Sequence, residues 1–216
     1  YLGSHFDIHC GGVDNIFPHH ENEIAQSVCA LDSKFVNYWL HNEHLLVNND
    51  KMSKSTGNFY TLRDLIKKGY SPQAIRYSLM STHYRQKLNF TFDKINNSQK
   101  SINKLNELKR RLLIVDGSRS SAKDFNNKKE ILLEDFSSSL NDDLNISGGL
   151  GELFKWVSYI FSCLDNNDIS VEQSKEAISV LDKIDTVLGV LNSNDENNIS
   201  DKERKLISQR EKARNE

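Results

Sequence analysis

Hydrophobic residues change their spacing along this chain at about residues 60–95. Before this region they occur in short runs, some alternating with polar residues, at positions 6–9, 36–40 and 44–47. Such runs are typical of short or buried strands. Beyond it they recur at intervals of three, four and seven, the period of helices with one buried face. The pattern therefore predicts an α/β part followed by a mostly α-helical bundle.

The expected bundle helices are marked by apolar positions on one face of each helix. A polar break at 141–145 precedes Gly148 and Gly149, which we expect to allow close helix packing. The first helix also carries basic residues on its opposite face, which either are solvated or contact an RNA backbone. These basic residues are Lys104, Lys109, Arg110 and Arg111. The inward positions are Ile95, Ile102, Leu105, Leu108 and Leu112; Phe136; Leu150, Leu153, Phe154, Val157, Ile160 and Phe161; and Ile178, Leu181, Ile184, Leu188 and Leu191.

Helix-start signals also occur in the first part of the chain. Pro18, followed by carboxylates, fits the first position of a helix that runs to about Ala30. Thr61 is expected to begin a second helix, and Ser71 caps a third. The inward positions of the third are Ile75, Leu79 and Met80.

A short segment rich in lysine and serine, KMSKS at residues 51–55, follows the turn expected at 48–50. Lysine ammonium groups, serine hydroxyls and loop amides all bind phosphate oxygens. On its chemistry alone, such a segment is usually a solvated turn. Because ligands of open parallel α/β sheets bind at the carboxyl ends of strands, this loop is suitably placed for a nucleotide site.

A glycine turn follows the first expected strand. Gly11 and Gly12 allow the backbone to approach a ligand, and Asp14 comes just after them. The Asp14 carboxylate could accept hydrogen bonds from ribose hydroxyls or cap a helix. The local sequence favours neither role.

Two histidines and two glutamates stand at the start of the helix expected from Pro18. His19 and Glu23 are four residues apart and share a helix face, so both could bind one metal ion. The alternative is a helix start with acidic residues placed for its dipole and histidines bonded to backbone. A metal site would need further ligands from elsewhere in the protein.

Composition limits the class of protein. The chain has 216 residues, a formal net charge of −2 and three cysteines, Cys10, Cys29 and Cys163, without CxxC spacing. No apolar run is long enough for a membrane or secretory segment, so we expect a soluble protein of the reducing cytoplasm without disulfides. Near-neutral charge leaves only local patches for nucleic acid, such as Tyr84 and Arg85, which alternatively pack at a domain junction.

Three motifs at matching spacing resemble cysteinyl-tRNA synthetase, a class I aminoacyl-tRNA synthetase. They are FDIHCGGVD at 6–14, FPHHENEIAQ at 17–26 and KMSKSTGNF at 51–59. The resemblance continues at 71–77 and 81–85, and more faintly at 142–145. It implies the last part of a Rossmann-like catalytic domain within residues 1–60, a stem-contact region at 61–95 and a helical tRNA-binding bundle at 96–216.

The resemblance implies that ATP and L-cysteine form cysteinyl-adenylate and that the cysteinyl group passes to the 3′ end of the tRNA for cysteine. Lys54 would contact the phosphates of ATP, which carries Mg²⁺, and Lys51 would assist, since charge accumulates there in the transition state. The adenosine pocket would be formed by His9, Gly11, Gly12 and Asp14, with Asp14 at the ribose. A monomer is also implied.

His19 and Glu23 match two of the four Zn²⁺ ligands of that family. Zinc would make such an enzyme select cysteine over serine, because a thiolate binds the ion far better than a hydroxyl does. The family's two cysteine ligands and its His-rich tetrapeptide do not occur in this chain, and Cys10 stands where the family has glycine. We therefore expect a fragment that lacks the start of the catalytic domain and the extreme C-terminus, where 203–214 begin a further helix, and that is inactive alone.

Two other functions remain open at the sequence level. One is a non-enzymatic module that holds RNA through its helical bundle. The other is a synthetase-like ligase that joins cysteine to a small amine, although such relatives usually lack a long bundle.

Overall fold

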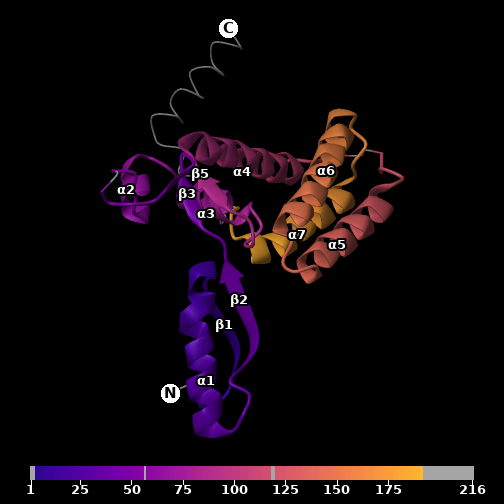
Figure 1. Ribbon diagram of the computed structural model, residues 1–216. Coiled ribbons are helices and arrows are strands. Elements are labelled where there is room, and N and C mark those ends of the chain that lie inside the picture. The colour runs from indigo at the N-terminus through magenta and orange to yellow at the C-terminus, as the bar shows by residue number, and fades with distance from the viewer. Residues whose placement is uncertain (1–2, 56, 118–119, 192–216) are drawn as a thin grey trace.

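A β-α-β unit forms the first part of the structure, a computed structural model that describes residues 3–55, 57–117 and 120–191 (Figure 1). Strands β1 (Phe6–Gly12) and β2 (Val36–Asn42) pair in parallel, with His9 opposite Trp39 and Gly11 opposite His41. Helix α1 (Glu21–Leu31) lies in the crossover that a parallel pair requires. The strands predicted at 6–9 and 36–40 are therefore confirmed, and both are longer.

The start of α1 differs from the prediction. Pro18 does not occupy its first position, because a short 3-10 turn (Val13–Asn15) and a π-type turn (Ile16–His20) come before the helix. Phe17 within the second turn is extended, at φ −133° and ψ 133°, and the Phe17–Pro18 peptide is cis. A residue before proline is driven out of the helical region, so the chain bends here and the helix begins three residues late.

A second sheet contains the described strands β4 (Asp50–Lys51), β3 (Leu45–Val47) and β5 (Leu88–Phe90), in that order. β3 and β4 form a tight antiparallel hairpin, whose turn residues Asn48 and Asn49 have φ of 52° and 70°. Asparagine tolerates this left-handed conformation better than most residues. The predicted turn is present, but the lysine segment follows an antiparallel hairpin in a sheet separate from β1 and β2.

Helices α2 (Leu62–Lys67) and α3 (Pro72–Met80) begin as the sequence predicts. Thr61 forms a capping box with Asp64, and the Ser71 hydroxyl accepts the amide hydrogen of Ala74. The inward face of α3 is partly different from the prediction, since Leu79 is 42% exposed. The buried residues of α3 are Ala74, Ile75, Tyr77 and Ser78.

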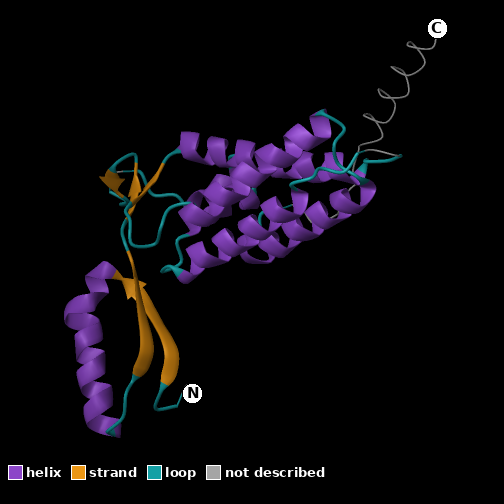
Figure 2. Cartoon of the chain, turned by 90° about the vertical axis from the view of Figure 1, so that its right-hand side faces the viewer, coloured by secondary structure: helices purple, strands orange, loops and turns teal. Residues whose placement is uncertain are grey.

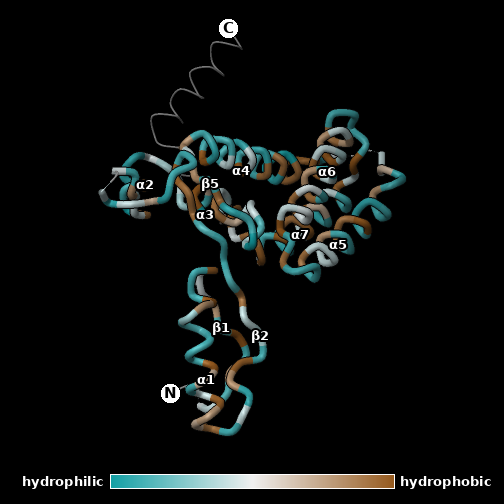
Figure 3. Tube along the Cα trace, viewed as in Figure 1, coloured by the Kyte–Doolittle hydropathy of each residue, from teal (hydrophilic) through white to brown (hydrophobic). Residues whose placement is uncertain are grey.

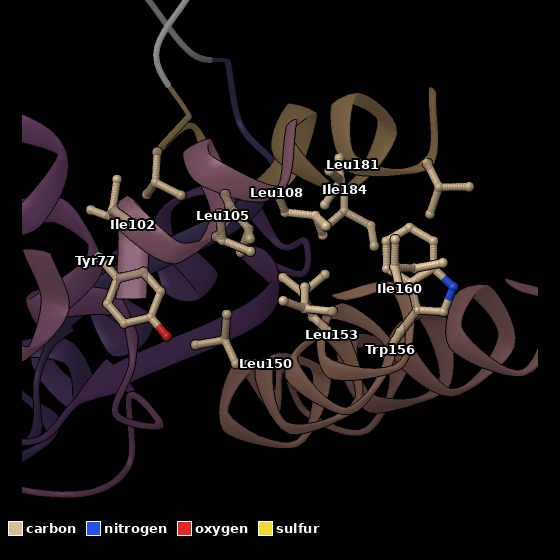
Figure 4. Packing of buried hydrophobic residues seen from close by; sticks show 14 of the residues in the cluster. Tyr77, Ile102, Leu105, Leu108, Leu150, Leu153, Trp156, Ile160, Leu181 and Ile184 are labelled. Atoms are coloured by element: carbon tan, nitrogen blue, oxygen red, sulfur yellow. The ribbon is translucent and has the colours of Figure 1, made fainter. Parts of the chain in front are cut away.

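The remainder of the described chain is a helical bundle of α4 (Phe92–Leu113), α5 (Phe125–Asn141), α6 (Ile146–Asp165) and α7 (Val171–Leu188) (Figure 2). Hydrophobic and hydrophilic stretches alternate along these helices (Figure 3), and their apolar faces meet in one core with Tyr77 of α3 (Figure 4). Gly149 lets α6 approach α5, because a Cβ there would lie 3.0 Å from the Phe136 ring. Most predicted inward positions are buried, whereas Phe154, Phe161, Ile178 and Leu191 are partly exposed.

The basic face predicted on α4 is only partly a surface. Lys109 is 9% exposed and its ammonium group pairs with Asp182 of α7 at 2.9 Å. Arg110 pairs with Glu107, and Arg111 with Asp165 of α6. Lys109 and Arg111 are thus paired with neighbouring helices, and Arg110 is paired at the surface of α4 itself. The helix predicted at 203–214 lies outside the described residues.

The β-α-β unit differs from the bundle in how little it buries. Among its described residues 3–42, only His20 and Val36 are buried. Large apolar side chains on its strands and helix remain open, including Ile8 at 57% and Tyr38 at 67% exposure. The core of the described chain therefore lies in the bundle and in the second sheet.

Candidate nucleotide and metal site

Imidazoles surround the carboxylate of Glu23 in the β-α-β unit. His9 reaches it from β1, with Nε2 3.3 Å from Oε2, and His19 from the turn before α1, with Nε2 3.4 Å from Oε1. Nitrogen and oxygen ligands of tetrahedral zinc, each about 2.0–2.1 Å from the ion, are separated from one another by roughly 3.3 Å. The separations of His9 and of His19 from Glu23 each match this value, and they end on different oxygens of the carboxylate.

The structure brings His19 and Glu23 together as predicted and adds histidines that the sequence did not single out as ligands. Ligand atoms of His9, His20 and Glu23 all lie within 4.8 Å of one another. Glu23 Oε2 is enclosed and accepts no hydrogen bond in the described structure, although His9 Nε2 lies near it. A buried carboxylate oxygen in this state is suited to a cation.

His20 is the buried member of this group, at 4% exposure. Its Nδ1 lies 2.8 Å from Nε2 of His41 on β2, so the two imidazoles share a hydrogen bond. Burial lowers the pKa of His20, and the neighbouring His9 lowers it further. The ring is therefore held neutral, the form in which histidine binds metals.

The Trp39 ring forms a wall beside these imidazoles, at 4.7 Å from His9 and 5.0 Å from His20 between ring centroids. Trp39 and His41 are two residues apart on β2, and in a strand this spacing places side chains on one face. The two-residue period of a strand was the sequence signal from which the shared face of Trp39 and His41 could have been predicted. Their contact with His20 depends on the parallel pairing of β1 with β2.

Gly11 and Gly12 lie at the end of β1 and not in a turn after it, so the predicted glycine turn is wrong. A Cβ on Gly11 would lie 2.5 Å from Cε1 of His20, so the imidazole occupies the space that a side chain would need. A Cβ on Gly12 would collide with the carboxylate of Asp14. Asp14 itself is exposed and makes no side-chain cap of the short turn, so the capping alternative is not realised. Cys10 is exposed on β1.

The lysine segment lies in the second sheet and the loop after it. Lys51 ends β4, and Lys54 extends into solvent with its ammonium group 5.5 Å from the centre of the Phe59 ring. Met52 is partly buried against the core. The side chain of Asn58 closes the loop by bonding to the backbone of Ser53 and of Lys51.

Tyr84 and Arg85, the other candidates for nucleic-acid contact, bind the turn between α5 and α6. The Tyr84 hydroxyl donates to Oδ1 of Asp143 at 2.5 Å, and Arg85 Nε lies 2.6 Å from Oδ2. Both side chains therefore pack at the junction of the sheets and the bundle.

Matches to known protein families separate the first part of the chain from the bundle, as the fold does. Residues 1–100 match the family described as tRNA synthetases class I (C) catalytic domain, and residues 135–192 match the DALR domain. The cysteine–tRNA ligase of Brachyspira hyodysenteriae is 48% identical over all of this chain and 47% of its own length. Along its whole length the chain is similar to cysteine–tRNA ligases. Further examples are the ligases of Leptospira interrogans serogroup Icterohaemorrhagiae serovar copenhageni, 48% identical over 98% of this chain and 46% of theirs, and of Chlamydia caviae, 41% identical over 100% and 45%.

The chain spans about half the length of these cysteine–tRNA ligases. Its fold resembles that of the agnB2 LeuRS of Agrobacterium radiobacter K84, solved in a ternary complex with tRNA and LeuAMS. The TM-score is 0.65 at 12% identity, over 81% of this chain and 25% of the LeuRS. The fold is thus of the class I synthetase catalytic-domain type, followed by a helical DALR domain. In the described ranges no helix is long and apolar enough to cross a membrane.

Proposed function

We propose that the full-length protein is a cysteine–tRNA ligase, which activates L-cysteine with ATP and transfers it to the 3′ end of the tRNA for cysteine. The observation that carries this proposal is the convergence of His9, His19 and Glu23 in a chain that also holds the KMSKS loop. The first arrangement suits a metal that binds a thiol, and the second suits a polyphosphate. The similarity to cysteine–tRNA ligases supports both.

Activation requires positive charge where the α-phosphate reacts and pyrophosphate leaves. Lys54 is exposed on the loop and Lys51 stands at its base, so both ammonium groups can meet phosphate oxygens. Because the charge on those oxygens rises in the transition state, the lysines lower the barrier more than they strengthen ATP binding. Mg²⁺ carried by ATP would neutralise the phosphates further.

The adenosine pocket that we propose lies at the end of β1, where Gly11 and Gly12 stand. His9, Gly11 and Gly12 form its wall and backbone, and the exposed carboxylate of Asp14 would accept hydrogen bonds from the ribose hydroxyls. The lysine loop would approach this pocket from the second sheet.

We propose that His19 and Glu23 hold Zn²⁺, with cysteines outside this chain as the other ligands. Zinc would bind the substrate thiolate and so favour cysteine over serine. His9 and the neutral His20 are placed to hold the carboxylate and the neighbouring ring in position. Such surrounding contacts orient metal ligands in proteins.

We propose that residues 1–60 carry out the reaction, that residues 61–95 contact the tRNA stem and that residues 96–216 make the remaining tRNA contacts. The DALR match over residues 135–192 supports a role of the bundle in tRNA binding. We also propose a cytoplasmic monomer.

Exchange of pyrophosphate into ATP by the full-length protein tests this function. Exchange should depend on cysteine and not on serine, and Lys54→Ala should lower its rate on the order of 100-fold or more. Lys67→Ala removes an exposed lysine of α2 and serves as the matched control, with unchanged exchange. Wild-type protein without cysteine-dependent exchange would refute the enzyme. Exchange without charging of tRNA would favour the ligase that uses a small amine.

A further inference from the structure

The side chain of Asn58 joins the two sides of the KMSKS loop. Its Oδ1 accepts the amide hydrogen of Ser53 at 2.8 Å, and its Nδ2 donates to the carbonyl oxygen of Lys51 at 3.1 Å. One amide group therefore bonds to the backbone on both sides of Met52. A primary amide offers a donor and an acceptor side by side in one neutral group.

The side chain of Met52 is a second anchor for this part of the loop. It lines an apolar pocket of about 190 Å³ between β3, β5, α2 and α3, with Leu65, Ile75 and Phe90 among the other walls. The backbone from Lys51 to Ser53 is thus fixed to the core by Met52 and to the end of the loop by Asn58.

The part of the loop beyond this anchor is a turn. The Gly57 amide bonds to the Lys54 carbonyl at 3.3 Å, and Gly57 has a φ of 70°, which favours glycine. The hydroxyl groups of Ser53 and Ser55 lie 2.6 Å apart. Lys51 therefore stands on the anchored side and Lys54 on the turn, and Asn58 fixes the relation between the two.

We propose that Asn58 is a positioning residue for adenylate formation, which sets the ammonium groups of Lys51 and Lys54 at the spacing that the reacting phosphates require. This inference rests on the proposed function of the loop. Asn58 acts through the backbone and touches no substrate. Displacement of a reacting group by about 1 Å costs on the order of 100-fold in rate, so loss of the amide should lower kcat without an equal rise in the KM for ATP.

A double-mutant cycle in the full-length protein tests this role. We expect Asn58→Ala to lower kcat of cysteine-dependent pyrophosphate exchange by roughly 10–100-fold, with less than about a threefold change in the KM for ATP. In a Lys54→Ala background the same change should lower kcat less than it does in the wild type, because the part of its effect that acts through Lys54 is already lost. A purely structural loss would instead add to the effect of Lys54→Ala.

The matched control is Asn89→Ala on β5, in the sheet from which the KMSKS loop leaves. Asn89 also makes a reciprocal pair of amide bonds, to the backbone and side chain of Asn49, both at 2.8 Å, at the far end of the β3–β4 hairpin. This variant should keep wild-type kcat. Equal losses in both asparagine variants, or additive effects of Asn58→Ala and Lys54→Ala, would overturn the positioning role.

The outcomes separate this inference from the proposed function. If Lys54→Ala abolishes exchange while Asn58→Ala leaves kcat unchanged, the loop works as proposed and the role of Asn58 is wrong. If the wild-type protein shows no cysteine-dependent exchange, the proposed function itself fails. A circular dichroism melt of each variant verifies that the fold persists.

Discussion

The guanidinium of Arg85 and the carboxylate of Asp143 form an ion pair that joins the segment after α3 to the turn between α5 and α6. Tyr84 donates to the same carboxylate, and His83 Nε2 lies 2.8 Å from the Asp143 carbonyl oxygen. The Glu43 amide bonds to the Tyr84 carbonyl, which ties the end of β2 to the same point. The β-α-β unit, the second sheet and the bundle therefore meet around one aspartate.

This junction should weaken in acid. Hydrogen bonds from Tyr84 and then Arg85 hold the pKa of Asp143 below its ordinary value. A carboxyl whose pKa is depressed by folding stabilises the fold above its unfolded pKa, near 4, and loses this contribution as pH falls through the lower folded pKa. We expect Asp143→Asn to reduce the free energy of unfolding at pH 7 and to reduce it progressively less below pH 4. Urea titrations from pH 7 to 3 measure the difference, and parallel curves for the two proteins would contradict it.

Gly11→Ala should destabilise the β-α-β unit. The added Cβ would press on His20, which is buried and bonded to His41 and so has little room to move. Overpacking of this kind costs about 1–3 kcal/mol. Gly151→Ala is the matched control, since a Cβ there meets nothing within 4 Å inside α6, and it should stabilise by about 0.5–1 kcal/mol. Urea unfolding of each variant gives these values, and unchanged stability in Gly11→Ala would show that His20 can move aside.

The stability of the fold should change differently when Lys109 or Asp182, which form an ion pair, is replaced. Asp182→Asn leaves the buried Lys109 ammonium without its counter-charge and should cost about 1–2 kcal/mol, since Asp182 is half exposed and water relieves part of the loss. Lys109→Met keeps the apolar stem without the charge and should be neutral or slightly stabilising. Thermal melts measure both. Glu107→Gln breaks the exposed pair with Arg110 and should show no measurable change, whereas an equal loss in all variants would refute the distinction.

Zinc content tests the metal proposal directly. His19→Ala and Glu23→Gln should each lower the bound zinc of the purified full-length protein by at least 10-fold, because each removes a ligand. His44→Ala removes an exposed histidine that pairs with Glu43 outside the cluster, and it should retain zinc. Elemental analysis after dialysis against a chelator gives the ratio of zinc to protein. Full retention of zinc in both ligand variants would exclude His19 and Glu23 as ligands.

Local signals in the sequence were sufficient for much of the fold. Ser71, Thr61 and the paired Asn48 and Asn49 each act within a few residues, so their cap or turn could be predicted from their own neighbourhood. Gly149 likewise indicated close packing, although not its partner. The bundle followed from helical period alone.

Long-range contacts could not be predicted in the same way. The bond between His20 and His41 depends on the register of two strands, and Lys109 lies inward because Asp182 of α7 neutralises it there. Pro18 satisfied every local rule for a helix start, but Phe17 before it was forced to extend. Similarly, the sequence around Asn58 did not indicate that its side-chain amide bonds to the backbone of Lys51 and Ser53.

Because few side chains are buried in residues 3–42, the imidazole cluster also bears on the stability of this unit. His20 and Val36 are the described buried side chains of this segment, so few apolar contacts among residues 3–42 themselves hold β1, α1 and β2 together. His9, His19 and Glu23 come from β1, the turn and α1, and any ligand that binds all three would tie these elements together. Occupancy would then raise the opening free energy by mass action. A ligand bound to all three residues would thus add links among these elements that their own few apolar contacts do not supply.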